Sequence, residues 1–313
     1  MVATAFLFPG QGSQVVGMGK ALAEAFPESR AVFEAVDDAL GDPLSRLCFG
    51  GPEAELVLTR NTQPSILATS IAAHAAWTAN GGPPAAFVAG HSLGEYSALV
   101  AAGALGLADA ARSVRARGNF MQQAVPPGTG AMAAVLGLPA EDVARICAES
   151  ANGDVVSPAN YNSPEQTVIA GEAGAVERAS AVLRQAGAKK VIPLSVSAPF
   201  HCALMEPVKP RLAEVLGECT VSAPRIPVVS NVEAAGNSDP SRIVPLLLTQ
   251  VSAPVRWVES IRWLAAAGAT RVVELGPGRV LGGLVKRISK EIEVLNVEDP
   301  ASLEKALAAA RAA

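Results

Sequence analysis

A single serine stands between two glycines in the stretch Gly90-His-Ser-Leu-Gly94, which has the form G-x-S-x-G. A strand-like apolar segment precedes it, and a helix-like segment begins at Leu93. A sharp turn from strand to helix exposes the serine oxygen, and the helix N-terminus offers N–H groups to a developing oxyanion. Serine is also a favoured N-cap residue, so the pentapeptide alone fits either a nucleophile or a helix cap. The strand before it and the helix after it favour a nucleophile.

A serine nucleophile needs a base, and the chain has only 3 histidines. His74 lies in an alanine-rich helical segment without a polar cluster, which indicates a structural residue. His91 adjoins Ser92, but neighbouring side chains at such a turn point apart, so we expect it to have a supporting role. His201 lies where a predicted strand ends just before a helix, which is where a base carried by a loop is expected.

Other classes of protein stay open at this point. The serine turn also belongs to α/β-hydrolases, which would make the chain an esterase or lipase with the order Ser, acid, His. Against that reading, more than a hundred residues follow His201, and no acidic residue between Ser92 and His201 stands out as a third member. Cys202 is an alternative nucleophile, although a lone cysteine in apolar surroundings is usually inert packing. A binding or scaffold module would explain the fold but not the pairing of serine with histidine.

Composition excludes further classes. The 313 residues are 50% apolar and 17% charged, and the formal net charge of -4 argues against a nucleic-acid binder. The apolar stretch 98–108 is shorter than the roughly 20 residues that span a bilayer, and the N-terminus reads as a strand and turn rather than a signal peptide. We therefore expect a soluble, cytoplasmic protein with no membrane contact. The cysteines show no metal-ligand spacing and are expected to be free thiols; they are Cys48, Cys147, Cys202 and Cys219.

The elements that must position the serine and histidine alternate between short strand-like runs and alanine-rich helices. This alternation predicts crossover units and a mainly parallel sheet, with functional loops at the carboxyl ends of its strands. The expected strands are 5–8, 86–89, 225–230 and 271–275, and the expected helices are 29–40, 63–80, 93–103 and 258–267.

The middle of the chain has a different order, β-α-β-β-α-β, which predicts a ferredoxin-like unit. Its expected strands are 132–137, 155–161, 166–171 and 188–194, and its helices are 139–150 and 173–187. Segments 126–128 and 195–199 are the predicted hinges. The sequence thus predicts an α/β fold with a hydrolase-like, mainly parallel large domain (1–127 and 196–313) and an inserted ferredoxin-like small domain (128–195).

Six strings occur in order along the chain. They are Phe8-Pro-Gly-Gln-Gly-Ser-Gln14, Gly90-His-Ser-Leu-Gly-Glu-Tyr-Ser97, Arg117-Gly-Asn-Phe-Met-Gln122, Asn160-Tyr-Asn-Ser-Pro164, Gln250-Val-Ser-Ala-Pro-Val-Arg-Trp257 and Glu274-Leu-Gly-Pro-Gly278. Together they resemble the malonyl-CoA:acyl carrier protein transacylase family over nearly the whole chain. The resemblance implies a hydrolase-like α/β domain with a ferredoxin-like insertion. It also implies transfer of a malonyl group from malonyl-CoA, through an acyl-enzyme, to the phosphopantetheine thiol of acyl carrier protein, for fatty acid synthesis.

The same resemblance implies the catalytic roles. Ser92 takes the acyl group and His201 acts as its base. The backbone carbonyl of Gln250 orients that histidine in place of an acidic third member. Backbone N–H groups of Gln11 and Leu93 form the oxyanion hole.

Substrate choice is implied to depend on Arg117. A guanidinium can hold the free malonyl carboxylate with two parallel hydrogen bonds, a geometry that lysine cannot match. Without the motif, an ordinary surface arginine would be the preferred reading, because Arg112 and Arg115 lie on the same predicted helix. Phe200 resembles the bulky residue that malonyl-selective members carry beside the histidine. The predicted substrate-binding set is completed by His91, Asn160 and Gln63.

Partners follow from the implied reaction. Carrier proteins are generally acidic, so basic residues near the cleft are candidate contacts for the carrier or for coenzyme A, although each fits a solvated surface charge as well. These candidates are Lys189, Lys190, Lys286 and Arg287. We expect a monomer that needs no cofactor and no metal. A free-standing acyltransferase that serves a polyketide synthase is the alternative.

Overall fold

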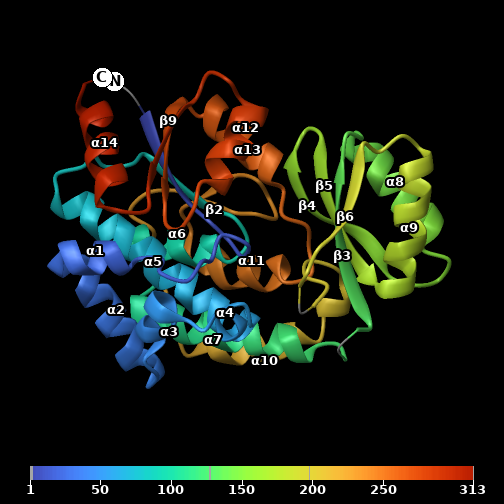
Figure 1. Cartoon of the computed structure of the whole chain (residues 1–313), viewed down its shortest axis with the longest axis horizontal. Helices are drawn as coiled ribbons and strands as arrows, with labels where there is room; N and C mark the ends of the chain where they lie inside the picture. Colours follow the sequence, from blue (N-terminus) through green and yellow to red (C-terminus); the bar gives the residue numbers. More distant parts are fainter. Residues whose placement is uncertain (1–2, 127, 197, 313) are drawn as a thin grey trace.

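The computed structural model describes residues 3–126, 128–196 and 198–312, which form two lobes that each contain one β-sheet (Figure 1). The large lobe holds a six-stranded sheet in the order β10-β9-β1-β2-β7-β8. Every neighbouring pair is parallel except β7 with β8, which confirms the predicted α/β class and mainly parallel sheet. Its strands are β1 (Ala3–Phe8), β2 (Phe87–Gly90), β7 (Val228–Val229), β8 (Gly236–Asn237), β9 (Ala269–Leu275) and β10 (Glu293–Val297).

Helices cover both faces of this sheet, so its central strands are apolar on both sides. In β1, Phe6 and Phe8 enter one hydrophobic core, whereas Ala5 and Leu7 enter the other, as alternation along a strand requires. The helices of the lobe are α1 (Lys20–Ala25), α2 (Pro27–Leu40), α3 (Leu44–Gly50), α4 (Glu53–Leu56), α5 (Thr59–Ala79), α6 (Gly94–Ala101), α7 (Leu107–Gln123), α10 (Val208–Gly217), α11 (Ile243–Gln250), α12 (Trp257–Ala266), α13 (Val280–Ile288) and α14 (Pro300–Arg311), with 3₁₀ turns at Ala203–Met205 and Pro240–Arg242.

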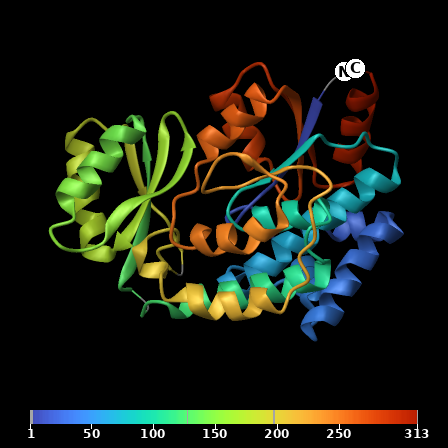
Figure 2. The same cartoon turned by 180° about the vertical axis from the view of Figure 1, so that it is seen from behind.

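The small lobe is a four-stranded antiparallel sheet in the order β4-β5-β3-β6, which is the ferredoxin-like arrangement predicted from the β-α-β-β-α-β pattern. Its two helices lie on the outer face, and the other face is turned toward the large lobe (Figures 1 and 2). In β3, Ala133 and Val135 pack under those helices, whereas Met132 and Ala134 line a cavity between the lobes. The elements are β3 (Gly130–Leu136), α8 (Ala140–Ser150), β4 (Val156–Ser163), β5 (Gln166–Glu172), α9 (Ala173–Gln185) and β6 (Lys190–Pro193).

Main-chain hydrogen bonds join the lobes. Val255 donates to the carbonyl of Ala159 at 2.9 Å, and Tyr161 donates to the carbonyl of Val255 at 2.9 Å. The segment after α11 therefore pairs with the edge of β4 as a short parallel bridge. The predicted hinges each include one residue outside the described ranges, Pro127 and Ser197, and the domain limits at 128 and 195 stay a prediction.

Candidate active site

Ser92 lies in the tight turn that joins β2 to α6, at the carboxyl end of the parallel strands. Its φ is 51°, a left-handed conformation that is strained for a residue with a side chain. The flanking glycines allow the turn: a Cβ on Gly90 would lie 1.9 Å from the carbonyl oxygen of Gly94, and a Cβ on Gly94 would lie 2.0 Å from the carbonyl oxygen of Phe8. The elbow predicted from the G-x-S-x-G spacing is thus present, and no larger residue fits at either glycine.

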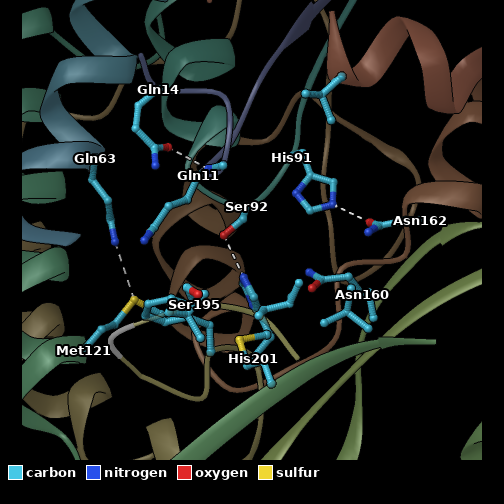
Figure 3. A pocket seen from close by; sticks show the side chains of 18 of the residues that line it. Gln11, Gln14, Gln63, His91, Ser92, Met121, Asn160, Asn162, Ser195 and His201 are labelled. Atoms are coloured by element: carbon cyan, nitrogen blue, oxygen red, sulfur yellow. Dashed lines mark hydrogen bonds between the residues drawn. The ribbon is translucent and has the colours of Figure 1, made fainter. Parts of the chain in front are cut away.

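His201 reaches the serine from a part of the chain 109 residues away. Its Nε2 lies 2.7 Å from Ser92 Oγ (Figure 3). Its Nδ1 lies 2.8 Å from the backbone oxygen of Gln250 and 3.2 Å from that of Ala253. A carbonyl oxygen only accepts, so the proton is on Nδ1 and Nε2 is free to accept the serine proton. Burial and the charge of Arg117 lower the pKa of His201 to about 3, which keeps the imidazole neutral.

Arg117, on α7, is buried beside the serine and is not a surface arginine. Its Nη1 donates to Gln63 Oε1 at 2.9 Å, and its Nη2 donates to Gln250 Oε1 at 2.9 Å and to Ser92 Oγ at 3.2 Å. Its Nε has no hydrogen-bond partner among the described residues, and burial lowers its pKa. A buried cation whose acceptors are all neutral is poorly compensated, which makes this position receptive to an anion.

A cavity of about 510 Å³ opens onto these groups between the two lobes. Loops at the carboxyl ends of β1 and β2 form one wall, and strands β3, β4 and β5 form the other. Of the predicted residues, it brings together Gln11, Gln63, His91, Ser92, Arg117, Asn160, Phe200 and His201. Figure 3 shows Ser92 and His201 pointing toward each other within this space.

The two backbone N–H groups predicted for an oxyanion hole flank the serine. Gln11 follows β1, and Leu93 is the residue after Ser92. Neither N–H donates to an acceptor among the described residues. Both donors are therefore available to a ligand oxygen.

His91 turns toward the small lobe, where its Nε2 lies 2.8 Å from Asn162 Oδ1 (Figure 3). His74 instead packs edge-on against Phe6 in the core, with ring centroids 5.6 Å apart, far from this chemistry. Burial raises the pKa of Cys202 to about 11, and its Sγ donates to a main-chain carbonyl, so it is present as a thiol.

Sequence reasoning missed two residues that hold the elbow. The backbone N–H of Ser92 donates to Asn231 Oδ1 at 2.6 Å, and Asn231 Nδ2 donates to the carbonyl of Gly90 at 2.6 Å. Glu95 is 3% exposed, and its Oε2 accepts from the backbone N–H of Asn231 at 3.0 Å. Asn231 directly follows a predicted strand, which was a usable signal, whereas nothing local marked Glu95 as buried.

The four basic residues singled out from the sequence lie together in a groove of about 590 Å³. Lys189 directly precedes β6 and Lys190 begins it. Lys286 and Arg287 lie in the last turn of α13. Lys290 also lines this groove. Lys189 forms an exposed ion pair with Glu165 at 3.4 Å. We call this surface the basic groove: Lys189, Lys190, Lys286, Arg287 and Lys290.

Within the described ranges, no group of three or more His, Cys, Asp or Glu side chains is placed to hold a metal ion. None of the helices in the same ranges combines the length and apolar character needed to cross a membrane.

The fold and the serine–histidine pair at its elbow fit an acyl transferase, and residues 5–305 match the family described as acyl transferase domain, which shows the class. The malonyl CoA-acyl carrier protein transacylase of Salmonella typhimurium (strain LT2) is 48% identical over 98% of this chain and 99% of its own length. The acyl-carrier-protein S-malonyltransferase of Bartonella henselae superposes with a TM-score of 0.96 at 48% identity, covering 99% of this chain and 100% of that one.

A further solved structure, a type II PKS acyl-carrier protein in complex with its malonyl-transacylase, gives a TM-score of 0.96 at 47% identity, covering 98% of this chain and 99% of that one. With these matches, the chain belongs to the malonyl CoA-acyl carrier protein transacylase family. The resemblance read from the six strings is thereby confirmed.

Proposed function

We propose that this protein transfers a malonyl group from malonyl-CoA to the phosphopantetheine thiol of acyl carrier protein, through a covalent intermediate on Ser92. One observation supports malonyl as the substrate: the buried guanidinium of Arg117 lies 3.2 Å from Ser92 Oγ, and all its acceptors among the described residues are neutral. An esterase pocket for neutral acyl groups has no use for such a cation. A substrate whose far end is a carboxylate supplies the missing negative charge.

In the first half-reaction, His201 Nε2 takes the proton of Ser92 as the serine oxygen attacks the thioester carbonyl. The carbonyl oxygen becomes an oxyanion, and the unpaired N–H groups of Gln11 and Leu93 stabilise it. Collapse of this intermediate breaks the carbon–sulfur bond, and the imidazolium returns its proton to the sulfur of the departing coenzyme A. The carbonyl of Gln250 accepts from Nδ1 throughout, so the ring keeps its orientation in both protonation states.

The second half-reaction runs the same steps in reverse with a different thiol. His201 takes the proton of the phosphopantetheine thiol, and the sulfur attacks the malonyl ester on Ser92. The intermediate collapses, the malonyl group leaves on the carrier, and the serine oxygen regains its proton from the imidazolium. This cycle needs no metal or cofactor, because serine, imidazole and guanidinium supply every step.

The remaining predicted residues have supporting roles in this proposal. Phe200 is 8% exposed and lies on the cavity wall beside the base, where it limits the space for a branched acyl chain. Gln63 holds Arg117, and Asn160 faces the cavity from β4. His91 fixes the turn to the small lobe through Asn162.

The basic groove is the proposed contact for the carrier or for the phosphates of coenzyme A, since both are anionic and the groove adjoins the cavity at Glu165 and Gln166. The protein is proposed to act as a monomer in the cytoplasm, where its four free thiols stay reduced. We also propose that the two lobes are domains, with the small domain at 128–195 inserted between 1–127 and 196–313.

Fatty acid synthesis is the proposed destination of the malonyl group. The 47% identical malonyl-transacylase bound to a type II PKS acyl-carrier protein favours a second candidate, supply of a polyketide synthase. Transfer rates to purified carriers of the two kinds, measured side by side, distinguish these destinations.

Intact-mass analysis after mixing with malonyl-CoA tests the central claim. The wild type should gain one malonyl group, and Ser92→Ala should gain none. Added acyl carrier protein bearing phosphopantetheine should remove the adduct and carry its mass. Hydrolysis of neutral esters without a malonyl adduct would refute the proposal and favour the hydrolase.

A further inference from the structure

Glu95 is a buried carboxyl that the mechanism above does not use. It lies in the first turn of α6, three residues after the nucleophile, and it is 3% exposed. It does not line the cavity, and it forms no ion pair with any residue in the described ranges. Its Oε2 accepts from the side-chain Nε2 of Gln250 at 2.8 Å and from the backbone N–H of Asn231 at 3.0 Å. Removing a carboxyl from water costs free energy unless hydrogen bonds compensate it, so its two N–H partners are the place to look for its role.

That partner is the side-chain amide of Gln250, which lies between Glu95 and Arg117. Its Nε2 donates to Glu95 and to the backbone oxygen of Ser92 at 3.0 Å, and its Oε1 accepts from Arg117 Nη2 at 2.9 Å. A guanidinium only donates, and Oε2 of Glu95 already serves as an acceptor for a backbone N–H. In the opposite orientation of the amide, the N–H groups of Gln250 would face the N–H groups of Arg117, and neither could accept a hydrogen bond. Glu95 and the Ser92 carbonyl therefore both hold the N–H end of the amide, which leaves its oxygen facing Arg117.

Gln250 thus acts at two points of the site. Its backbone oxygen accepts from His201 Nδ1 at 2.8 Å, and its side-chain oxygen accepts from Arg117. The backbone contact survives any substitution at position 250, whereas the side-chain contact requires both the amide and Glu95. The base and the cation can therefore be perturbed separately.

We propose that Glu95 is a positioning residue for acyl selectivity: by orienting the Gln250 amide, it aims the guanidinium of Arg117 at the place of the malonyl carboxylate. The inference rests on the proposed function. Burial raises the pKa of Glu95 to about 7, although the hydrogen bond from Gln250, that from Asn231 and the charge of Arg117 act in the opposite direction. Oε2 can accept both N–H groups whether or not the other oxygen is protonated, so the role persists in either state.

Two substitutions at position 95 distinguish the effect of the acceptor oxygen from the effect of side-chain volume. Glu95→Gln keeps one acceptor oxygen at the same length, and Glu95→Met keeps the length without an acceptor. The readout is the ratio of kcat/KM for malonyl-CoA to kcat/KM for acetyl-CoA, because acetyl has no carboxylate for Arg117 to hold. Glu95→Met should lower this ratio by about tenfold to a hundredfold, the range for a lost hydrogen bond to a charged group. Glu95→Gln should lower it by less than about fivefold.

A double-mutant cycle tests whether Glu95 acts through Gln250. Gln250→Met retains the backbone oxygen but loses the side-chain amide, so it should lower the same ratio. Glu95→Met combined with Gln250→Met should then lower the ratio no further, because the amide that Glu95 orients is already gone. Equal losses for the two acyl groups in Glu95→Met, or additive losses in the double variant, would overturn the inference.

Folding is checked by circular dichroism and thermal unfolding of each variant. If Glu95→Met does not fold, Glu95→Asp replaces it in the test. Its carboxyl is one methylene too short to reach the Gln250 amide, so the malonyl-to-acetyl ratio of kcat/KM should fall. An unchanged ratio would overturn the inference. A failure of the proposed function has a different signature. In that case the wild type itself forms no malonyl adduct on Ser92.

Discussion

Replacing Arg117 by alanine should separate malonyl transfer from acetyl transfer. In the proposed complex the guanidinium makes two charge-assisted hydrogen bonds to the malonyl carboxylate, each worth about 1.5–3 kcal/mol. Their sum, about 3–6 kcal/mol, corresponds to a loss of about 10²- to 10⁴-fold in kcat/KM for malonyl-CoA. Acetyl-CoA has no carboxylate, so its transfer should fall much less.

The assay measures kcat/KM for both thioesters with acyl carrier protein as acceptor. Arg112→Ala is the matched control, because Arg112 lies on the same helix, is exposed and pairs with Asp109 at 2.5 Å. This control should stay within about twofold of the wild type for both substrates, as is usual for surface substitutions. Arg117→Lys keeps the charge but loses the planar fork, so it should fall between alanine and the wild type. Equal losses for malonyl and acetyl in Arg117→Ala would refute the reasoning.

Three further predictions use other features of the site. Arg117→Gln removes a positive charge that disfavours the imidazolium of His201, so the pKa of His201 should rise from about 3. The acid limb of the pH profile of acetyl transfer should then move to higher pH. An acid limb that stays in place would contradict this electrostatic cause. Gly94→Ala would place a Cβ 2.0 Å from a main-chain oxygen of β1, so it should lower the free energy of unfolding by about 1–3 kcal/mol or more in chemical denaturation. Gly283→Ala, with open space on α13, should instead raise it by about 0.5–1 kcal/mol, and equal effects of the two substitutions would contradict this steric cause. Cys202→Ser should still form the malonyl adduct in intact-mass analysis, and loss of the adduct would make this cysteine a candidate nucleophile.

Much of the fold could be predicted from local patterns. Strands β1 and β2 follow from runs of buried apolar residues. The ferredoxin-like order follows from the spacing of its strand-like and helix-like segments, although β4 is only partly buried and β6 is mostly exposed. The strand expected at 225–230 proved to be only Val228–Val229. Pro227 precedes it and has no N–H to donate, which limits the ladder. The edge strands β8 and β10 were not predicted, since they are short and only partly buried.

The active site also contains residues that the sequence predicts and contacts that it does not. Ser92 and His201 could be found from a motif and from a choice among three histidines. The contacts that hold them could not be found in this way, because they join residues far apart in sequence. Asn231 and Gln250 meet Glu95 from 136 and 155 residues away. Their side chains have ordinary surface chemistry in the sequence, and only packing of α11 and the β7 loop against α6 makes them buried and paired.

A neutral carbonyl, rather than a carboxylate, orients His201, and this choice suits a site that also contains the charge of Arg117. A carboxylate on Nδ1 would raise the pKa of the imidazole and would also attract the neighbouring guanidinium, leaving less of its charge for a substrate. The carbonyl of Gln250 orients the ring without adding charge. No Asp or Glu is among the described residues that line the cavity, and the nearby carboxyl of Glu95 is separated from Arg117 by one amide. The site thus keeps its base neutral and leaves its cation without a directly bonded anion among the described residues, and both conditions favour an acyl group that brings its own negative charge.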